Sequence, residues 1–533
     1  MFFVGILLGA TLMSKAHSAN VLVIAGMFGS HLYLSIDIAE KLVEFGHNVT
    51  VLTLCSDSKV NGVDKPYRVM TLMNEDETEL FSKKHEVAVQ GWIHHPSKDM
   101  TMEMFVATAN AMKAKSSSSF ERTNDILQKY FAGEDFSNLL RTGHFDLIVL
   151  EHSTSHYAMT GLVDQDIPIL GFLCTGIVQE INSRYGLPGL MNSEPGNLND
   201  VTNSPPTFIE RWQTLVRLGY TISAFLSLLQ NANTGTEKSF QELYTASYDV
   251  AFINDHPAFS FPFLKSPNTF YLGTFHLDNR PIIPLPDDYL EFLANCPHKN
   301  TVFLSFGTNI RDLMTFSGTS TILETLHHMD VCVIIKSKVD LRLNFDLPSE
   351  KFLQQSWIPQ KDLLGSGKLD FFISHCGNNG KLEAIYYNVP LLCIPLFGDQ
   401  YFNGRLVERN NFGLLLPWET VTRNTLTKYV NQMLTDRETF VANMKRAAEI
   451  ARNDPGSGVG VLKFYTDLLI KNRSADHLIN RIILNQSKNE VYNLDIGAIV
   501  LILMLCLFGG VLFCLLKCFR FCFTKIGNKM KVD

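Results

Sequence analysis

Short apolar runs recur along the chain, and amphipathic stretches separate them. The run Val21–Ala25 predicts a buried strand, and it precedes His31–Phe45, whose apolar residues recur at the helical period. Gly46 then stops the helix, and a second run, Asn48–Leu54, predicts another strand. Runs that are apolar throughout are typical of parallel strands covered on both faces. The other runs that predict such strands are Phe145–Leu150, Ile167–Phe172, Val302–Phe306, Val331–Ile335, Leu369–Ser374 and Leu391–Ile394.

This alternation of strands and helices occurs twice, once on either side of a proline-rich segment. Asp278–Asp288 (DNRPIIPLPDD) has the composition of an interdomain linker. Alternating β and α elements in both halves predict an α/β protein with two Rossmann-like domains that face each other across a cleft. We place the N-terminal domain at residues 20–280 and the C-terminal domain at residues 281–480. A length of 533 residues suffices for two domains and additional segments.

Both ends of the chain are apolar in ways that indicate targeting to a membrane. Met1–Leu12 is an apolar run followed by small residues, which predicts a signal peptide over residues 1–19, although its start lacks a positive charge. Ile496–Leu516 has 21 residues and no charge, enough for a transmembrane helix across about 30 Å of hydrocarbon. Five basic residues and one acid follow in residues 517–533, so the positive-inside rule predicts a cytosolic tail and a lumenal bulk. The final residues, Lys529–Asp533, resemble the dilysine retrieval signal of type I proteins of the endoplasmic-reticulum membrane.

Cysteines and glycosylation sequons bear on this lumenal placement. Six cysteines precede the apolar C-terminal stretch, and several lie inside predicted strands, so we expect mostly free, buried thiols. Asn48, Asn472 and Asn485 begin Asn-x-Ser/Thr sequons and are candidate glycosylation sites. The last two are the better candidates because they lie between the last predicted globular helix and the membrane. The six cysteines are Cys55, Cys174, Cys296, Cys332, Cys376 and Cys393.

The segment from Trp357 to Gln400 holds the densest chemistry of the chain. Within it, a predicted strand leads through a tight polar turn, His375–Gly380, into a predicted helix over Lys381–Asn388. Such a strand–turn–helix unit directs backbone N–H groups and the positive end of a helix at one point, which suits a phosphate. Asp399 and Gln400 follow the next predicted strand. Ligands of open α/β sheets bind at the carboxyl ends of strands, where these residues fall.

Individual side chains in this segment fit a nucleotide. Trp357 can stack on a planar base, and Gln360 offers both a donor and an acceptor to its edge. Gly377 and Gly380 let the backbone approach an anion because no Cβ intervenes. Glu383, one turn into the predicted helix, can reach paired ribose hydroxyls. A lone Trp or His is usually a packing residue, but an ordered set of this length is improbable by chance.

The segment resembles the signature of the UDP-glycosyltransferases, specifically the membrane-bound animal UDP-glucuronosyltransferase type. The patterns W-x-x-Q, H-x-G-x-N-G-x-x-E and P-x-x-x-x-P-x-x-x-D-Q all occur in it without a gap. The resemblance implies the fold called GT-B, with the acceptor pocket in the first domain and the UDP-sugar in the second. One departure is Cys376, where the family usually has Gly or Ala; a buried Cys is small enough for that position.

Roles for single residues follow from the same resemblance. Uracil would contact Trp357 and Gln360, the ribose would contact Glu383, and the sugar hydroxyls would contact Asp399 and Gln400. The turn Ser305–Thr308 resembles the family's S-x-G-S/T element, which contacts the diphosphate. The implied contacts of the diphosphate are Ser305, Gly307, Thr308, His375, Gly377, Asn379 and Gly380.

Glycosyl transfer to a hydroxyl group needs a base, and His titrates near neutral pH. His31 lies in a Gly-Ser-His element after the first predicted strand, where the family carries its catalytic base. Glu151 falls on the position of the family's orienting Asp. Glu keeps the charge but is one methylene longer, which makes this a second departure. His152 is a weaker candidate for the same role.

Composition excludes some other functions. The net charge of −7 argues against a broad nucleic-acid surface. Asp164-Gln165-Asp166 has the D-x-D form of manganese-dependent glycosyltransferases, but it precedes Ile167 in a predicted loop, where Asp is simply favoured. We therefore expect neither a metal nor a cofactor beyond the donor substrate. The Gly26–Gly29 and Gly456–Gly460 runs do not match a dinucleotide fingerprint.

The resemblance thus implies an inverting, metal-independent transferase that moves glucuronic acid or glucose from a UDP-sugar to a small lipophilic acceptor, as in detoxification. It would be a single-pass type I protein of the endoplasmic-reticulum membrane that can pair with itself or with related transferases. The alternative is a catalytically silent UDP-sugar-binding protein that acts by pairing with active relatives, and Glu151 is the feature that favours it. Lys59–Gln128 and Gly186–Leu243, where the acceptor would bind, show little motif.

Overall fold

The computed structural model describes residues 18–26, 29–55, 65–79, 126–162, 164–176, 248–263, 265–278, 280–307, 318–396, 399–479 and 494–529. Most of the predicted signal peptide lies outside the described residues, as do Thr308, Asn485 and nearly all of the predicted acceptor region. The chain divides into two compact units, Met1–Ile479 and Asn480–Asp533.

The first half of the larger unit is a seven-stranded parallel sheet with the strand order β3-β2-β1-β4-β5-β6-β7. The apolar runs form its centre, where every residue of β4 and β5 is buried. The chain order reverses between β1 and β4, which creates a topological switch point of the kind where α/β sheets bind ligands. The strands are β1 (Asn20–Ile24), β2 (Asn48–Thr53), β3 (Arg68–Thr71), β4 (Leu147–Glu151), β5 (Ile169–Leu173), β6 (Val250–Ile253) and β7 (Thr269–Tyr271).

Helices cover this sheet. Helix α2 (Gly29–Glu44) follows β1 and lies beside β2, with Leu32, Ile38 and Leu42 buried in the core. A short 3-10 turn, η1 (His152–Thr154), continues from β4 into α7 (Ser155–Leu162). Together with α6 (Glu134–Gly143), these elements bring the first turn of α2 and the end of β4 to the same edge of the sheet.

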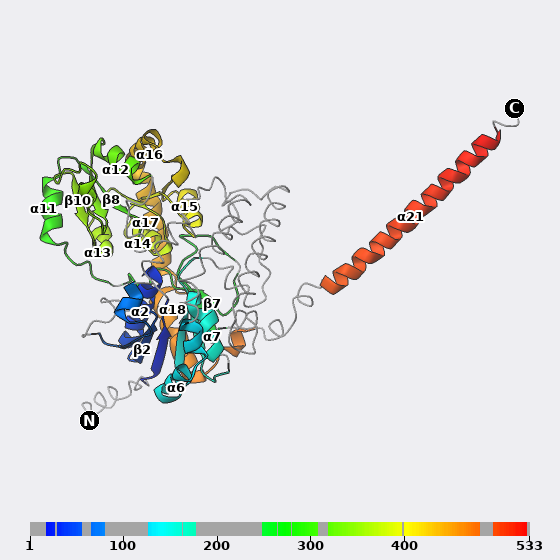
Figure 1. The fold of residues 1–533 in the computed structure, drawn as a ribbon, viewed down its shortest axis with the longest axis horizontal. Coiled ribbons are helices and arrows are strands. Elements are labelled where there is room, and N and C mark those ends of the chain that lie inside the picture. Colours follow the sequence, from blue (N-terminus) through cyan, green and yellow to red (C-terminus); the bar gives the residue numbers. More distant parts are fainter. Residues whose placement is uncertain are drawn as a thin grey trace, which may run out of the picture. The chain divides into compact units, whose positions relative to one another are not determined.

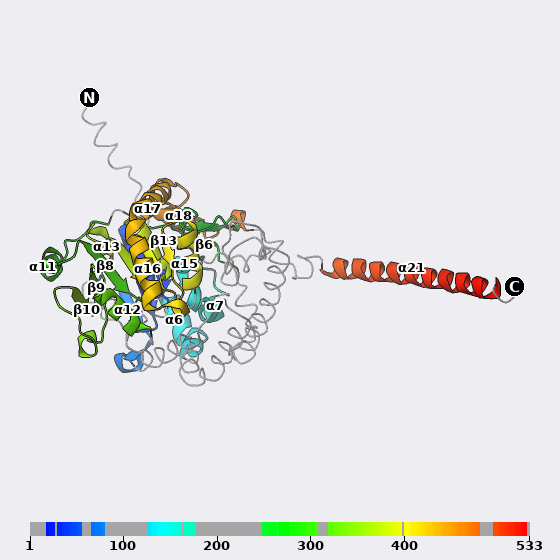
Figure 2. The same ribbon diagram turned by 90° about the horizontal axis from the view of Figure 1, so that it is seen from above.

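The second half is a six-stranded parallel sheet with the strand order β10-β9-β8-β11-β12-β13. Its central strands are again apolar, and Phe303 of β8 stacks on Phe372 of β11. Helices α12 and α16 pack on one face of this sheet, whereas α13 and most of α17 pack on the other. Figure 2 labels these helices around β8, β9 and β10. The strands are β8 (Asn300–Ser305), β9 (Val331–Lys336), β10 (Phe352–Gln355), β11 (Phe371–Ser374), β12 (Leu391–Cys393) and β13 (Gly413–Leu415). The helices and 3-10 turns are α11 (Asp287–Asn295), α12 (Thr319–His327), η4 (Leu341–Leu343), α13 (Gln360–Gly365), α14 (Asn378–Tyr386), α15 (Gln400–Arg409), η5 (Trp418–Thr420), α16 (Arg423–Thr435) and α17 (Arg437–Asn453).

The last helix of the larger unit, α18 (Gly458–Asn472), packs on the first sheet. Its residues Val461, Leu462 and Leu469 belong to the same buried cluster as Val21 and Leu147. Figure 1 shows α18 (orange) beside the blue and cyan elements of the first half. A 3-10 turn, η6 (Asp476–Leu478), ends the unit.

The smaller unit contains one long helix, α21 (Leu494–Lys529), drawn in red in Figure 1. Its stretch Ile496–Cys518 has a mean hydropathy of 3.1 and is not buried against other parts of the protein. By length and composition this helix is a candidate membrane span, in agreement with the predicted Ile496–Leu516.

The predicted strands are confirmed to within about two residues. The helix of the polar turn begins earlier than predicted, at Asn378, because Gly377 already serves as its N-cap. Asn379 and Gly380 therefore lie in the first helical turn. Strands β3, β6, β7, β10 and β13 were not predicted.

The prediction of mostly free thiols is wrong for four of the six cysteines before α21. Cys296 bonds to Cys332, and Cys376 bonds to Cys393. The second pair forms because β11 and β12 are adjacent parallel strands with Ser374 opposite Cys393, so a cysteine just past the end of β11 lies next to this strand. Cys55 and Cys174 lie outside these two disulfides and are buried thiols, as predicted.

Candidate active site

His31 and Glu151 lie together at the carboxyl edge of the first sheet. His31 is in the first turn of α2, directly after β1, and Glu151 is the last residue of β4. Because β1 and β4 are paired parallel strands, their ends meet. His31 Nδ1 and Glu151 Oε1 are 3.0 Å apart. The extra methylene of Glu, compared with Asp, therefore does not prevent the contact.

The surroundings of Glu151 hold its carboxylate in place. Its side chain is fully buried, and Oε2 accepts hydrogen bonds from the backbone N–H and the hydroxyl of Ser153. Burial raises the pKa of Glu151, but His31 and Ser153 outweigh burial, and the net pKa lies below its ordinary value. An ionised carboxylate only accepts, so the proton of a neutral His31 lies on Nδ1 and Nε2 keeps its lone pair. Nε2 can then take a proton from a substrate.

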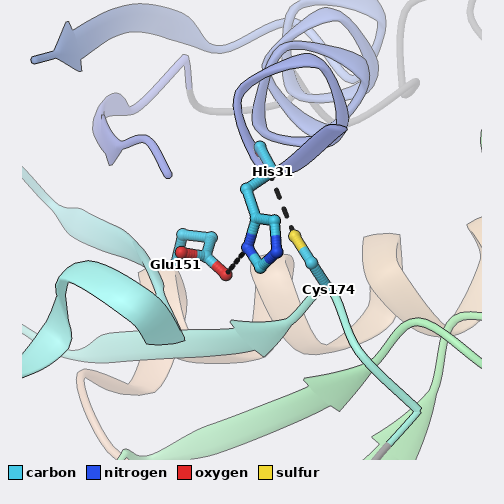
Figure 3. A group of neighbouring side chains, drawn as sticks. All are labelled: His31, Glu151 and Cys174. Atoms are coloured by element: carbon cyan, nitrogen blue, oxygen red, sulfur yellow. Dashed lines mark hydrogen bonds and ion pairs between the residues drawn. The ribbon is translucent and has the colours of Figure 1, made fainter. Parts of the chain in front are cut away.

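Neighbouring residues fit closely around this pair. A Cβ at Gly26 would meet His31 Cβ at 2.5 Å, so the backbone between β1 and α2 needs glycine there. Figure 3 shows the His31 ring between Glu151 and Cys174. Burial, with Glu151 adding to it, raises the pKa of the Cys174 thiol well above its ordinary value. The weaker candidate, His152, instead makes a hydrogen bond with the Tyr248 hydroxyl at 3.0 Å.

In the second half, His375 follows β11 and lies between two glycines. A Cβ at Gly307 would come within 2.7 Å of the His375 ring, and one at Gly377 within 2.6 Å. Gly307 also has φ +89°, a conformation that favours glycine. Burial, with Lys336 adding to it, lowers the pKa of His375 to about 4. The imidazole is therefore neutral at pH 7 and can donate one hydrogen bond.

The structure places the predicted uracil- and ribose-binding residues beside one another. Trp357 is 45% exposed, with Lys336 Nζ 4.8 Å from its ring centroid and the Tyr33 ring edge-on at 6.3 Å. Gln360 Nε2 donates to Glu383 Oε2 at 2.6 Å. Burial raises the pKa of Glu383, although Lys361, Gln360 and Lys336 oppose it.

The other described residues that were predicted to contact the UDP-sugar also lie at this edge. Several of them already form hydrogen bonds within the protein. Asp399 accepts from Asn403 Nδ2 at 2.8 Å, and burial raises its pKa. Gln400 Oε1 accepts from the Leu396 N–H at 2.9 Å. Asn379 Nδ2 donates to the backbone carbonyl of Ser30 at 3.3 Å. Ser30, the residue next to the candidate base His31, thus contacts α14 through Asn379.

Polar contacts join the two halves around α14. Asn378 Nδ2 donates to the carbonyls of Cys174 at 2.9 Å and Asn254 at 2.6 Å. Lys381 and Asp255, both buried, form an ion pair at 3.1 Å. On the other side, Lys361 pairs with Asp37 at 3.2 Å. The carboxyl edges of the two sheets therefore meet at one site.

Sequence reasoning missed four residues at this site: Tyr33, Cys174, His276 and Lys336. Cys174 directly follows β5, so the rule that ligands bind at strand ends could have identified it. His276 precedes the linker, is almost fully buried, and has Nε2 4.0 Å from Glu383 Oε1. No motif marks His276 or Tyr33, because only the fold brings them to the second half.

The sequon and D-x-D residues lie elsewhere. Asn48 and Asn472 are exposed, at the start of β2 and the end of α18. Asp164 and Asp166 lie in the loop between α7 and β5, where the Asp166 carbonyl accepts from Arg473. The D-x-D residues therefore lie in a loop before a strand, as the sequence predicts.

Comparison with known proteins bears on this arrangement. Residues 19–532 match the family model described as UDP-glucoronosyl and UDP-glucosyl transferase. Human UDP-glucuronosyltransferase 3A1 is 25% identical over 529 residues, covering 94% of this chain and 93% of the relative. UDP-glucosyltransferase 2 of Dactylopius coccus is 23% identical, covering 88% of this chain and 87% of the relative.

Solved structures have the same fold. A UDP-glucosyltransferase from Polygonum tinctorium that glucosylates indoxyl superimposes with a TM-score of 0.55 at 13% identity, covering 86% of this chain and 100% of that chain. UDP-glucose:anthocyanidin 3-O-glucosyltransferase in complex with UDP gives 0.56 at 16% identity, covering 86% and 100%. The chain therefore belongs to the UDP-glucoronosyl and UDP-glucosyl transferase family, a family of UDP-sugar glycosyltransferases, and has the GT-B fold.

Proposed function

We propose that this protein transfers a hexosyl group, glucuronic acid or glucose, from its UDP-sugar to a hydroxyl group of a small lipophilic acceptor. His31 is the general base and Glu151 orients it. The observation that carries this proposal is the 3.0 Å contact between His31 Nδ1 and a fully buried, ionised Glu151, next to the donor helix α14. The same contact supports an active enzyme over the silent alternative, which the replacement of Asp by Glu151 favours.

The reaction is a single in-line displacement. His31 Nε2 takes the proton of the acceptor hydroxyl as its oxygen attacks the anomeric carbon. The bond between that carbon and the β-phosphate oxygen breaks, and its electron pair leaves with UDP. An α-linked donor then gives a β-glycoside. Donation from His375 and from backbone N–H groups at the start of α14 would stabilise the leaving diphosphate without a metal.

Each proposed donor-binding residue holds one part of the UDP-sugar. Trp357 and Gln360 serve uracil, Glu383 the ribose, and Asp399 and Gln400 the sugar hydroxyls. Ser305, Gly307, Thr308, His375, Gly377, Asn379 and Gly380 serve the diphosphate. Relatives named for glucuronic acid, glucose and galactose transfer share similar identities with this chain, so the sugar must be found by experiment.

We further propose that the chain is a type I protein of the endoplasmic-reticulum membrane. Its signal peptide would end near Ala19, α21 would span the membrane, and Asn48, Asn472 and Asn485 would carry lumenal glycans. The apolar helix of 23 residues and the basic tail support this placement.

A donor screen with the purified full-length chain tests the transferase. UDP release is measured with UDP-glucuronic acid, UDP-glucose and UDP-galactose against a panel of phenols. We expect turnover with glucuronic acid or glucose as the sugar. UDP-sugar binding without turnover over the whole panel would contradict the proposal.

Two variants separate binding from chemistry. His31→Ala should keep its UDP affinity but lose roughly 10²–10⁴-fold in kcat, because the base acts only on the acceptor proton. Trp357→Ala should instead raise the donor KM, because stacking of Trp357 on uracil holds the UDP-sugar in the ground state as well as in the transition state. Full activity of His31→Ala, or an unchanged donor KM in Trp357→Ala, would refute the respective role.

A further inference from the structure

The catalytic pair has a third neighbour with metal-binding chemistry. His31, Glu151 and Cys174 follow or end three strands that are consecutive in the sheet, β1, β4 and β5. A ring nitrogen of His31, a carboxylate oxygen of Glu151 and the sulfur of Cys174 all lie within 4.8 Å of one another (Figure 3). Parallel pairing of the strands fixes this arrangement in the backbone.

The spacing is close to that of a tetrahedral zinc site. Zinc binds His nitrogen, carboxylate oxygen and Cys sulfur at about 2.0–2.3 Å, so two ligand atoms on one ion lie roughly 3–4 Å apart. The 3.0 Å between His31 Nδ1 and Glu151 Oε1 already matches. Cys174 Sγ lies within 4.8 Å of the other two ligand atoms and 4.0 Å from the His31 carbonyl oxygen.

Charge and access also suit a cation. Glu151 is ionised, and the carboxylate of Asp399 is close enough to act electrostatically on both Cys174 and His31. Glu151 and Cys174 are buried, whereas the His31 side chain is 31% exposed, so an ion can enter from the side of His31. A set of one N, one O and one S ligand favours zinc over magnesium or calcium, which prefer oxygen alone.

We propose that His31, Glu151 and Cys174 form a zinc site that switches the enzyme off. A zinc ion replaces the thiol proton of Cys174, which leaves to the solvent, and coordinates Cys174 Sγ, a Glu151 oxygen and His31 Nδ1, with a water as fourth ligand. The proton of His31 Nδ1 moves through the solvent to Nε2. The base can then no longer accept the proton of the acceptor. The inhibitory effect rests on the proposed function, whereas the metal site itself does not.

Spectroscopy tests the site without any need for turnover. The purified full-length chain is titrated with Co²⁺, which substitutes for zinc and gives a charge-transfer absorption band when a thiolate binds it. We expect one Co²⁺ per chain with this band, and its loss when Zn²⁺ is added. Cys174→Ser should lose the band and bind zinc at least about tenfold more weakly, since even outer partners of metal ligands change affinity 10- to 100-fold.

Cys55→Ser is the matched control, because Cys55 is also a buried thiol of the first half, just after β2. It should keep the band and the zinc affinity. UDP binding, measured for both variants, shows that they are folded. Absence of the thiolate band in the unmodified chain, or an unchanged band in Cys174→Ser, would overturn the proposal.

Transferase assays then test inhibition. Zn²⁺, but not Mg²⁺, should inhibit, and a chelator should restore the activity. The zinc-free activity of Cys174→Ser is its own reference, and zinc should inhibit this variant less than it inhibits the unmodified chain. Equal zinc inhibition of Cys174→Ser would overturn the proposed switch. A thiolate–cobalt band in a chain without turnover would refute the proposed function and leave the metal site standing.

Discussion

At the scale of single residues, the contact of Glu151 with the candidate base is the most informative result. Glu replaces the Asp expected from the resemblance, yet its Oε1 reaches His31 while Oε2 is held by Ser153. The longer side chain therefore has both oxygens fixed by partners. Sequence could identify the position of Glu151 but not this geometry, which depends on the 3-10 turn that follows β4.

Substitution of Glu151 tests its orienting role. Glu151→Gln keeps the shape but can donate to His31 Nδ1, which favours the wrong tautomer. We expect kcat to fall by about 10²–10⁴-fold, in the range found for Asp→Asn in a catalytic triad. The donor KM should stay the same, because Glu151 touches no donor group.

Two further variants sharpen this comparison. Glu151→Asp should retain more activity than Glu151→Gln, because the charge remains and only the reach is shorter. Ser153→Ala, which releases one oxygen of Glu151, should reduce kcat less than either. If Glu151→Gln keeps full kcat, Glu151 does not orient the base.

The buried His375 gives a pH dependence to stability. Its pKa is about 4 in the folded chain, against 6.5 ordinarily, so the unfolded chain binds the proton first. Its contribution to stability is therefore complete above pH 6.5 and is lost as pH falls towards 4, by up to about 1.4 kcal/mol per pH unit. The free energy of unfolding, measured in urea without donor between these pH values, should fall accordingly.

His375→Gln should flatten this dependence, because the variant cannot take up the proton. His328→Gln, at an exposed position of the same half, is the control and should leave the slope as it is. The same slope in both variants would show that His375 is not the group responsible. His276, whose pKa burial also lowers, should contribute to the remaining slope.

At the scale of elements, prediction succeeded where apolar runs were long. Strands β1, β8 and β9 have five or six residues and were predicted, whereas β7 and β13 have only three and were not. β12 also has three residues, but it was predicted because its apolar run continues to Ile394. Runs of three residues have no distinctive period, and only neighbouring strands stabilise them. Strand order is also absent from the local pattern.

The disulfide between Cys376 and Cys393 illustrates this limit. Its formation depends on β11 lying next to β12, which no sequence window reveals. The bond ties the turn that carries His375 to the neighbouring strand. Cys376 has φ 57°, so the turn also adopts a backbone conformation uncommon for residues other than glycine.

Removal of this disulfide should destabilise the chain and loosen the donor site. Cys376→Ala/Cys393→Ala opens a loop with a sequence separation of 17, worth about 3 kcal/mol in the free energy of unfolding. UDP affinity should fall as well, because His375 and the start of α14 lose their tether. Urea unfolding and UDP titration measure both effects.

Cys55→Ala, at a buried thiol far from α14 in the sequence, controls for loss of a sulfur. It should lower stability through packing but leave UDP affinity unchanged. An unaltered UDP affinity in the double variant would show that the disulfide supports the fold alone.

At the scale of the whole molecule, the two halves meet through buried polar contacts. Lys381 and Asp255 are 0% and 1% exposed, and each comes from a different half. A buried charge without its partner is costly, whereas loss of both charges is much less so. Lys381 occupies an unspecified position of the pattern from His375 to Glu383, and Asp255 lies in no recognised motif, so the sequence does not reveal the pair.

A double-mutant cycle measures this link. Lys381→Met should reduce the free energy of unfolding by about 3–5 kcal/mol, because Asp255 then remains buried and unpaired. Lys381→Met/Asp255→Asn should lose less than the single variant. Asp255→Asn is the second single variant of the cycle. If the double variant loses as much free energy of unfolding as the two single variants together, the ion pair does not couple the halves.

The packing of α18 on the first sheet has a consequence for how the molecule moves. Because α18 shares the core of Val21 and Leu147, the whole donor half is an insertion within the first fold, entered near Asp278 and left near Gly458. These two crossings lie side by side, since a Cβ at Gly458 would be 3.2 Å from Asp278 Oδ2. Two adjacent chain connections define one hinge axis between the halves and oppose rotation about other axes. We therefore expect the second half to rotate as one body about an axis through these two crossings.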